Sequence, residues 1–260
     1  MKKSCAVSLA LGLWVSCGLW AQTAEKPQGT TMRIRQEILL GDLSASTDYR
    51  ARFLPPDNFR VEGTMRLKTM EMDIQSTIVG NGPLVKQLSV TPLGPRAVTV
   101  DLARIRKALP EAHYAPSNTY DPSVYREMLQ NAPGKKRLAP ETLDGAETEG
   151  WELPLPEGRL STPSNVALGL PDPAKIRLWV NSKDGIARKV ELEDTRGQTF
   201  LKMAYTEVKT NAALPPGSFE LTFPDGVTPV DITDMILGGV AATRQQRPAE
   251  TKPPNTNEKR

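Results

Sequence analysis

The sequence predicts a mainly β protein, built on a strongly curved antiparallel sheet that two short helices interrupt. Three observations favour this class. Apolar and polar residues alternate along most of residues 32–90 and 175–223, turn residues punctuate the alternation, and helical spacing is confined to the middle of the chain. The strand groups on the two sides of the helices lack boundaries of their own. We therefore expect one domain over residues 30–243.

The first three strand segments are expected to form an antiparallel meander. Residues 32–40, 49–53 and 59–63 alternate between apolar and charged side chains, with breaks at Gly41-Asp42 and at residues 55–58. A period of two places the apolar set on one face of a sheet and the charged set on the other.

The next stretch, residues 64–79, changes phase. Met65 and Leu67 share one parity, whereas Met72 and Ile74 share the other. A phase change inside one strand is what a β-bulge produces, and bulges bend sheets. The sequence therefore predicts one long, bulged strand and strong curvature.

Two helices are expected after a further strand at residues 84–90. Apolar residues take helical spacing over residues 98–109, and a second helix begins after Asp121-Pro122, because proline is favoured at the first helical position. The polar stretch 131–150 is predicted to be a long connection that could act as a flap.

The second half returns to strands, with a hairpin loop signal at residues 181–185 and a turn at residues 194–197. The expected strands are residues 151–155, 175–180, 186–193, 199–208 and 219–223.

Residues 177–231 resemble the C-terminal half of LolA-like proteins, the outer-membrane lipoprotein carrier or lipoprotein-sorting superfamily. The matching motif residues are Asp194, Gly197, Asn211, Leu214, Pro215, Phe219, Pro224, Gly226 and Val227. Weaker similarity extends upstream to Met32. The resemblance implies an unclosed antiparallel β-barrel, or half-barrel, with a helical lid. Carriers of this family begin with an amphipathic helix before the first strand. In this chain, residues 22–31 are too short for such a helix and contain Pro27 and Gly29, so the lid is expected to be built differently.

The N-terminus carries an export signal pattern. Lys2 and Lys3 precede an apolar run that is too short to span a bilayer comfortably, so we expect a signal peptide at residues 1–21, cleaved after Ala21. Lipidation at Cys17 and an uncleaved anchor are the alternatives. In each case the chain is exported, and the expected location is the periplasm.

Composition excludes several classes of site. Both cysteines, Cys5 and Cys17, lie in the signal segment, and His113 is the one histidine, so no Cys/His metal site, disulfide framework or thiol nucleophile is expected. No cofactor is expected. Outside the signal and a disordered polar tail at residues 244–260, 26 basic residues face 28 acidic ones. That balance argues against nucleic-acid binding.

The residues expected to line an apolar pocket come from the strands and from the two helices. An ordinary hydrophobic core would contain the same residues. Methionine side chains also adapt to bound ligands of irregular shape. The candidate ligand-binding residues are Ile34, Ile38, Phe53, Phe59, Met65, Leu67, Met70, Met72, Ile74, Leu102, Ile105, Met128 and Leu129.

Two charged sets accompany these apolar candidates. Five arginines, Arg33, Arg35, Arg50, Arg52 and Arg60, could share one face and meet a lipid phosphate or an acidic partner, although a solvated face paired with glutamates is the preferred interpretation. Glu71 and Asp73, two apart on a strand, form the one carboxylate pair that could suggest catalysis. A surface ion network is the favoured interpretation of that pair.

The sequence therefore predicts an exported, noncatalytic carrier that binds lipid or acylated lipoprotein through acyl chains in an apolar concavity, as the resemblance implies. The alternative is an envelope protein-binding or stress-sensing module on the same scaffold with a filled core. A monomer is expected.

Overall fold

The computed structural model describes residues 28–40, 43–55, 57–108, 122, 124–155, 171 and 173–238. The strands are β1 (Gln28–Leu40), β2 (Leu43–Leu54), β3 (Asn58–Leu67), β4 (Met72–Asn81), β5 (Leu84–Thr91), β6 (Gly94–Asp101), β7 (Lys136–Leu143), β8 (Ala146–Pro154), β9 (Lys175–Asn181), β10 (Ala187–Glu193), β11 (Thr199–Ala213) and β12 (Val230–Asp231). The helices are α1 (Leu102–Ala108) and α2 (Val124–Asn131), and residues 233–238 are also helical.

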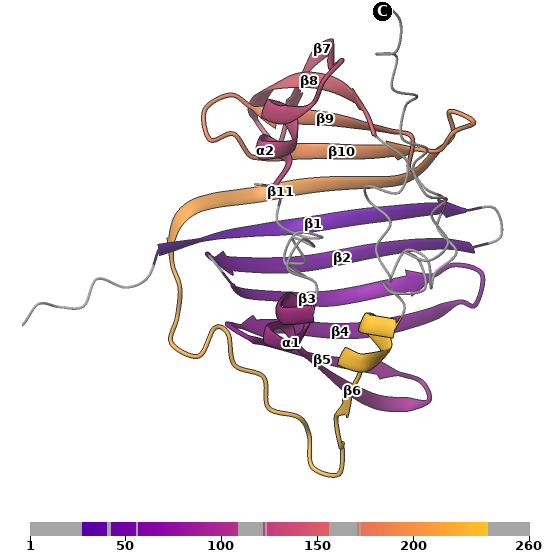
Figure 1. Cartoon of the computed structure of the whole chain (residues 1–260), viewed down its shortest axis with the longest axis vertical. Coiled ribbons are helices and arrows are strands. Elements are labelled where there is room, and N and C mark those ends of the chain that lie inside the picture. The colour runs from indigo at the N-terminus through magenta and orange to yellow at the C-terminus, as the bar shows by residue number, and fades with distance from the viewer. Residues whose placement is uncertain are drawn as a thin grey trace, which may run out of the picture.

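All of these strands belong to one 12-stranded sheet with the order β12-β6-β5-β4-β3-β2-β1-β11-β10-β9-β8-β7 (Figure 1). Because the order ends at β12 and β7, the sheet is not closed into a barrel. The expected mainly β class and the unclosed, curved antiparallel sheet are confirmed.

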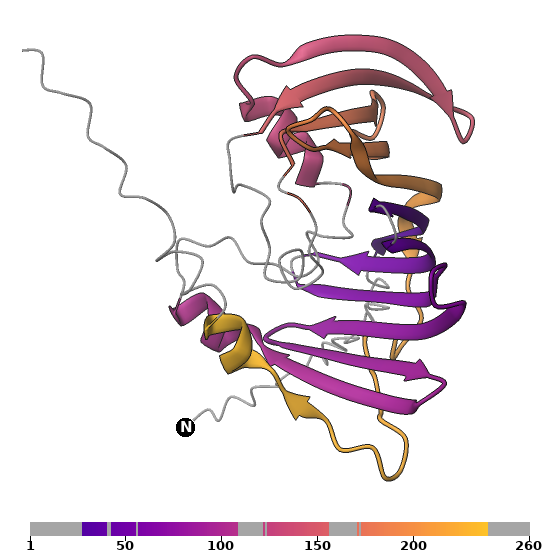
Figure 2. The same cartoon turned by 90° about the vertical axis from the view of Figure 1, so that its right-hand side faces the viewer.

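Two antiparallel meanders build the sheet. β1 to β6 pair in chain order, and β7 to β11 do the same. The pairing of β1 with β11 joins the meanders, with Ile34 opposite Tyr205. Both helices and residues 233–238 lie on the same side of this bent sheet (Figure 2). We call that side the inner face and the opposite side the outer face.

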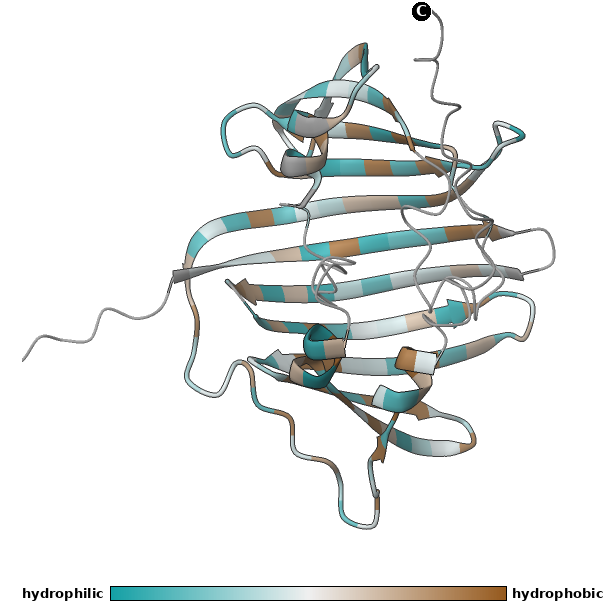
Figure 3. Cartoon of the chain, in the orientation of Figure 1, coloured by the Kyte–Doolittle hydropathy of each residue, from teal (hydrophilic) through white to brown (hydrophobic). Residues whose placement is uncertain are grey.

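The hydrophobic core lies on the inner face. Hydrophobic and hydrophilic residues alternate along many strands (Figure 3), and the apolar set of β1 and β2 is buried against residues of β9 to β11. Ile34, Leu178 and Tyr205, from three different strands, are fully buried. The sheet thus buries one side, as antiparallel sheets commonly do.

The phase change at residues 64–79 is a turn and not a bulge. β3 ends at Leu67 and β4 begins at Met72, with the turn 68–71 between them. The backbone N–H of Glu71 donates to the carbonyl of Lys68 at 3.3 Å, and Glu71 has a positive φ of 47°. The prediction of one long bulged strand was wrong, because a four-residue turn also reverses strand parity.

The stretch 131–150 is not a long polar connection. It contains β7 and the first part of β8, which pair as a hairpin. Strand β8 begins at Ala146 and not at Trp151. Most side chains of β7 are exposed. An edge strand of this kind lacks the apolar alternation on which strand prediction depends.

Two further expectations were wrong. Residues 94–101 form β6, so the helix begins at Leu102 and not near Val98. Residues 219–223 form no strand, although Phe219, Leu221 and Phe223 are half-buried. Side chains hold this segment: Arg60 donates to the carbonyl of Glu220 at 2.9 Å, and Lys86 donates to that of Leu221 at 3.2 Å.

The expected signal segment 1–21, with Cys5 and Cys17, lies outside the described residues, as do His113 and the expected polar tail 244–260. In the part that the structure describes, no helix has the length and apolar character that a membrane span requires.

Candidate functional site

Cross-strand rows of side chains divide the inner face into two ends. The first row runs Phe53, Phe59, Gly80, Val85 and Val100 across β2 to β6. Its four side chains are buried, and Leu102 and Ile105 of α1 belong to the same core cluster. We call this the closed end.

Packing at the closed end leaves no spare room. A Cβ on Gly80 would lie 2.1 Å from Cε1 of Phe59, which is far inside van der Waals contact. The glycine is therefore required by the ring that lies over it.

The opposite end of the same strands is less covered. One row runs Gln36, Thr47, Met65 and Ile74, and the next runs Ile38, Ala45, Leu67 and Met72. In contrast to the closed end, Met65, Leu67, Met72 and Ile74 of β3 and β4 are only half-buried, whereas their row neighbours Ile38, Ala45 and Thr47 of β1 and β2 are buried. We call these two rows the open end.

The predicted pocket residues distribute over these two ends and the lid. Ile34 and Ile38 are buried on the inner face, Phe53, Phe59, Leu102 and Ile105 belong to the closed end, and Met128 and Leu129 of α2 pack half-buried against the core. Met70 departs from the expectation that it lies in the sheet, because it is 65% exposed in the turn 68–71. Whether these residues touch a ligand stays a prediction.

Two buried hydroxyls on the inner face were not singled out as binding residues from the sequence. Thr47 is 5% exposed and Ser76 is 8% exposed. Neither hydroxyl oxygen has a hydrogen-bond partner in the part of the chain that the structure describes. Small polar residues at inward positions of otherwise apolar rows are the sequence signal that could have found them, because buried hydroxyls are normally hydrogen-bonded.

Helix α1 is anchored beside the closed end. The backbone N–H of Arg104 donates to Oδ1 of Asp101 at 3.0 Å, which caps the helix. The Asp101 N–H donates to Oγ1 of Thr233 at 2.9 Å, and Arg104 pairs with Asp234 at 2.5 Å. These contacts tie α1 to helical residues 233–238.

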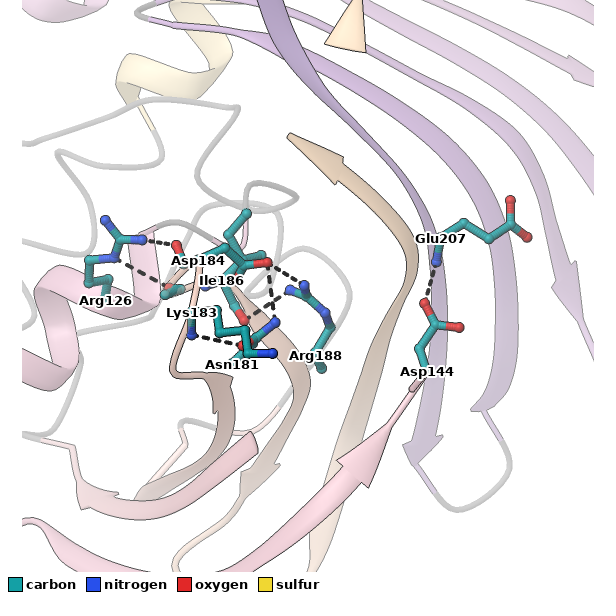
Figure 4. A network of polar contacts seen from close by, with 9 residues as sticks. Arg126, Asp144, Asn181, Lys183, Asp184, Ile186, Arg188 and Glu207 are labelled. Carbon is teal, nitrogen blue, oxygen red and sulfur yellow. Dashed lines mark hydrogen bonds and ion pairs between the residues drawn. The ribbon is translucent and has the colours of Figure 1, made fainter. Parts of the chain in front are cut away.

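Helix α2 is held by the turn between β9 and β10 (Figure 4). Arg126 donates to the backbone carbonyls of Asp184 and Gly185. The turn itself is rigidly bonded: Asp184 accepts from the N–H of Ile186 at 2.8 Å and pairs with the buried Arg188. The arginine therefore fixes a lid helix to the second meander.

The five predicted arginines lie on the outer face, and most are paired. Arg33 forms a forked ion pair with Asp48, with Nε to Oδ1 at 2.6 Å, and approaches Glu207 at 3.7 Å. Arg52 and Arg60 both pair with Glu62. The hydrogen bonds from Arg33 hold the pKa of Asp48 below its usual value. The preferred interpretation, a charged face paired with carboxylates, fits Arg33, Arg52 and Arg60.

Arg35 and Arg50 differ from the other three arginines, because neither has an ion-pair partner among the described residues, and Arg50 also lines a hollow. Arg50 shares this hollow of about 500 Å³ with Arg33, Asp48, Glu62, Gly63 and Thr64. Among the described residues, no carboxylate lies within ion-pair distance of Arg50, whereas the other charged side chains of the hollow are paired. The hollow could accept an anionic group from a partner.

The geometry gives no support to a catalytic carboxylate pair. Glu71 lies in the turn and Asp73 in β4, so the two do not share a strand face as the sequence suggested. Asp73 instead approaches Arg66 at 3.9 Å on the surface. In the described ranges, no group of three His, Cys, Asp or Glu side chains could hold a metal ion.

No protein-family model matches the sequence, and no curated protein matches it. Among solved structures, the chain is similar to an uncharacterized conserved protein from Thermus thermophilus, with 11% identity and a TM-score of 0.44 over 79% of this chain and 91% of that chain. It is similar to LprF from Mycobacterium bovis, with 14% identity and a TM-score of 0.41 over 77% and 90% of the two chains.

A LolA superfamily protein from Nitrosomonas europaea is also among the similar structures, with 13% identity and a TM-score of 0.28 over 75% of this chain and 91% of that chain. At these values the likenesses identify no ligand and no partner for this chain.

Proposed function

We propose that the chain is a noncatalytic carrier that binds the acyl chains of a lipid or lipoprotein at the open end of the inner face. The single observation that supports this most is the contrast in burial along the same strands. Phe53 and Phe59 are fully covered, whereas Met65 and Ile74, on the same face, are only half-covered.

Apolar binding is energetically reasonable at such a place. Each CH₂ removed from water contributes about 0.8 kcal/mol, so a few methylenes laid on half-buried methionine, leucine and isoleucine side chains suffice for useful affinity. The two methionines of the open end adapt to guests of irregular shape.

The experiment is lipid extraction and mass spectrometry of protein purified without detergent, together with uptake of a fluorescent fatty acid by delipidated protein. We expect co-purifying lipid and saturable uptake. Absence of both would contradict the carrier.

A matched pair of variants localises the site. Ile74→Trp fills the open end, whereas Gln75→Trp places the same ring on the outer face of the same strand, where Gln75 is exposed. We expect the first to weaken uptake about tenfold or more and the second to leave it unchanged, since a bulky side chain competes for the space that an acyl chain needs.

The second candidate function is an envelope protein-binding module with a filled core. The outer-face hollow favours it, because Arg50 has no carboxylate partner among the described residues there. In this case Arg50→Glu abolishes binding of an acidic partner segment, and the protein carries no lipid. Arg66→Glu, outside the hollow, is the control.

The proposal includes a periplasmic monomer that is exported by the signal segment 1–21. Mass measurement of the mature protein tests this part. Cleavage after Ala21 gives a free N-terminus at Gln22, whereas modification at Cys17 adds the mass of a lipid anchor.

A further inference from the structure

The open end contains one polar cross-strand pair, Gln36 and Thr47, between apolar rows. Thr47 lies opposite Gln36 on one side and Met65 on the other, and Met65 lies opposite Ile74. Thr47 shares its face with Tyr49, which is buried on the inner side of β2. Its side chain therefore lies on the inner face, beside the proposed ligand site.

The hydroxyl of Thr47 is an unusual group in this setting. It is 5% exposed and has no hydrogen-bond partner among the described residues, although the Gln36 amide is on the neighbouring strand. An unpaired buried hydroxyl destabilises a protein, whereas the same group is favourable when a ligand supplies the missing acceptor. We infer that Thr47 donates a hydrogen bond to the carbonyl oxygen of an ester- or amide-linked acyl chain, an inference that rests on the proposed carrier function.

The charge of the surroundings selects a neutral acceptor. The row Gln36, Thr47, Met65, Ile74 contains no charged residue, and neither do the two rows beside it across β1 to β4. A free carboxylate would lose its hydration there without gaining a cation. An ester or amide carbonyl needs only a donor, and Thr47, with the Gln36 amide beside it, supplies one.

Ser76 is not assigned the same role. It lies one row away and two strands from Thr47, which separates the two residues by roughly 12 Å along the sheet. One carbonyl cannot reach both hydroxyls.

The test compares two uncharged ligands that differ in one carbonyl, 1-hexadecanoyl glycerol and 1-hexadecyl glycerol. Wild-type protein is expected to bind the ester about two- to tenfold more tightly than the ether, the range that one neutral hydrogen bond supports. Thr47→Val should abolish this preference by weakening the ester alone, and Thr47→Ser should retain it. Thr77→Val, the same change on the outer face opposite Glu62, should leave the preference intact.

A second measurement separates ligand binding from a structural role. Without ligand, Thr47→Val should unfold at the same urea concentration as wild type or at a higher one, because the hydroxyl it removes is unpaired. A clear loss of stability would show a partner within the protein and would overturn the inference. Equal binding of ester and ether by wild type would also overturn it, while binding of neither would refute the carrier itself.

Discussion

The closed and open ends of the inner face share strands β2 to β4, yet they differ in what covers them. At the closed end, Phe53, Phe59 and Val85 pack with Leu102 and Ile105 of α1, and Gly80 is needed to make room for a ring. At the open end, Thr47, Met65 and Ile74 lie in a row that is only partly buried and includes an unpaired hydroxyl.

Strands β2 to β4 therefore have one tightly packed part, which contributes to stability, and one half-covered part, which we propose as the binding site. Interiors at native packing density have no room for a guest, whereas half-covered apolar side chains retain surface that a ligand can remove from water. The closed end therefore contributes to the core that stabilises the fold, and the open end is the part of these strands that we propose as the binding site.

The largest expected effect is on the closed end. Phe59→Ala should destabilise the protein by about 3–5 kcal/mol, because it removes a ring that is 1% exposed. The matched change Met65→Ala, on the same strand and face, should cost about 1 kcal/mol or less. Urea unfolding measures both, and equal losses would break the distinction between the ends.

A second change tests the fit of the glycine. Gly80→Ala should cost about 1–3 kcal/mol, because the added methyl group would overlap the Phe59 ring. In a Phe59→Leu background the same substitution should cost less, since the overlapping ring atoms are gone. Strictly additive losses in this double-mutant cycle would contradict the contact.

A third change sharpens the role of the lid beside the closed end. Asp101→Ala should cost about 1 kcal/mol, because the cap of α1 and its Arg104 N–H acceptor are lost. Ligand uptake at the open end should be unaffected. A stability loss accompanied by an equal fall in ligand affinity would show that the two ends are not separable.

The smallest effect concerns the outer face. The pKa of Asp48 is lowered by its hydrogen bonds from Arg33, so its contribution is present above the unfolded-state pKa of about 4 and is lost as pH falls through the lower folded-state pKa. Wild type should be slightly more stable than Asp48→Asn near pH 6, and the difference should shrink as the pH falls below about 4 toward the lower folded-state pKa. Thermal unfolding across this range is the measurement, and a difference that does not shrink below about pH 4 would contradict the ion pair.

The alternation of the strands was enough to predict the class, the two meanders and the inner-face residues from Met32 to Phe59. Prediction from alternation failed where a turn or a loop has the same residue pattern as a strand. A turn at residues 68–71 reverses parity as a bulge does, and Phe219, Leu221 and Phe223 alternate without being hydrogen-bonded into the sheet.

The candidate site was predicted only in part. Apolar spacing identifies Met65, Leu67, Met72 and Ile74 as sheet residues, but it cannot show that they are less covered than Phe53 and Phe59. Coverage depends on where α1 packs, and that is fixed by long-range contacts such as Asp101 with Thr233. The inward position of Thr47 can be read from the alternation, but the lack of a hydrogen-bond partner among the described residues is visible only in three dimensions.

Photo-crosslinking with a diazirine-bearing fatty acyl glycerol, followed by peptide mapping, tests whether acyl chains bind at the open end of the inner face. The expected adducts fall on the open end, in the peptides that contain Thr47, Met65 and Ile74, and they diminish in Ile74→Trp. Adducts confined to the outer face around Arg50, or the absence of saturable labelling, would contradict acyl-chain binding at the open end.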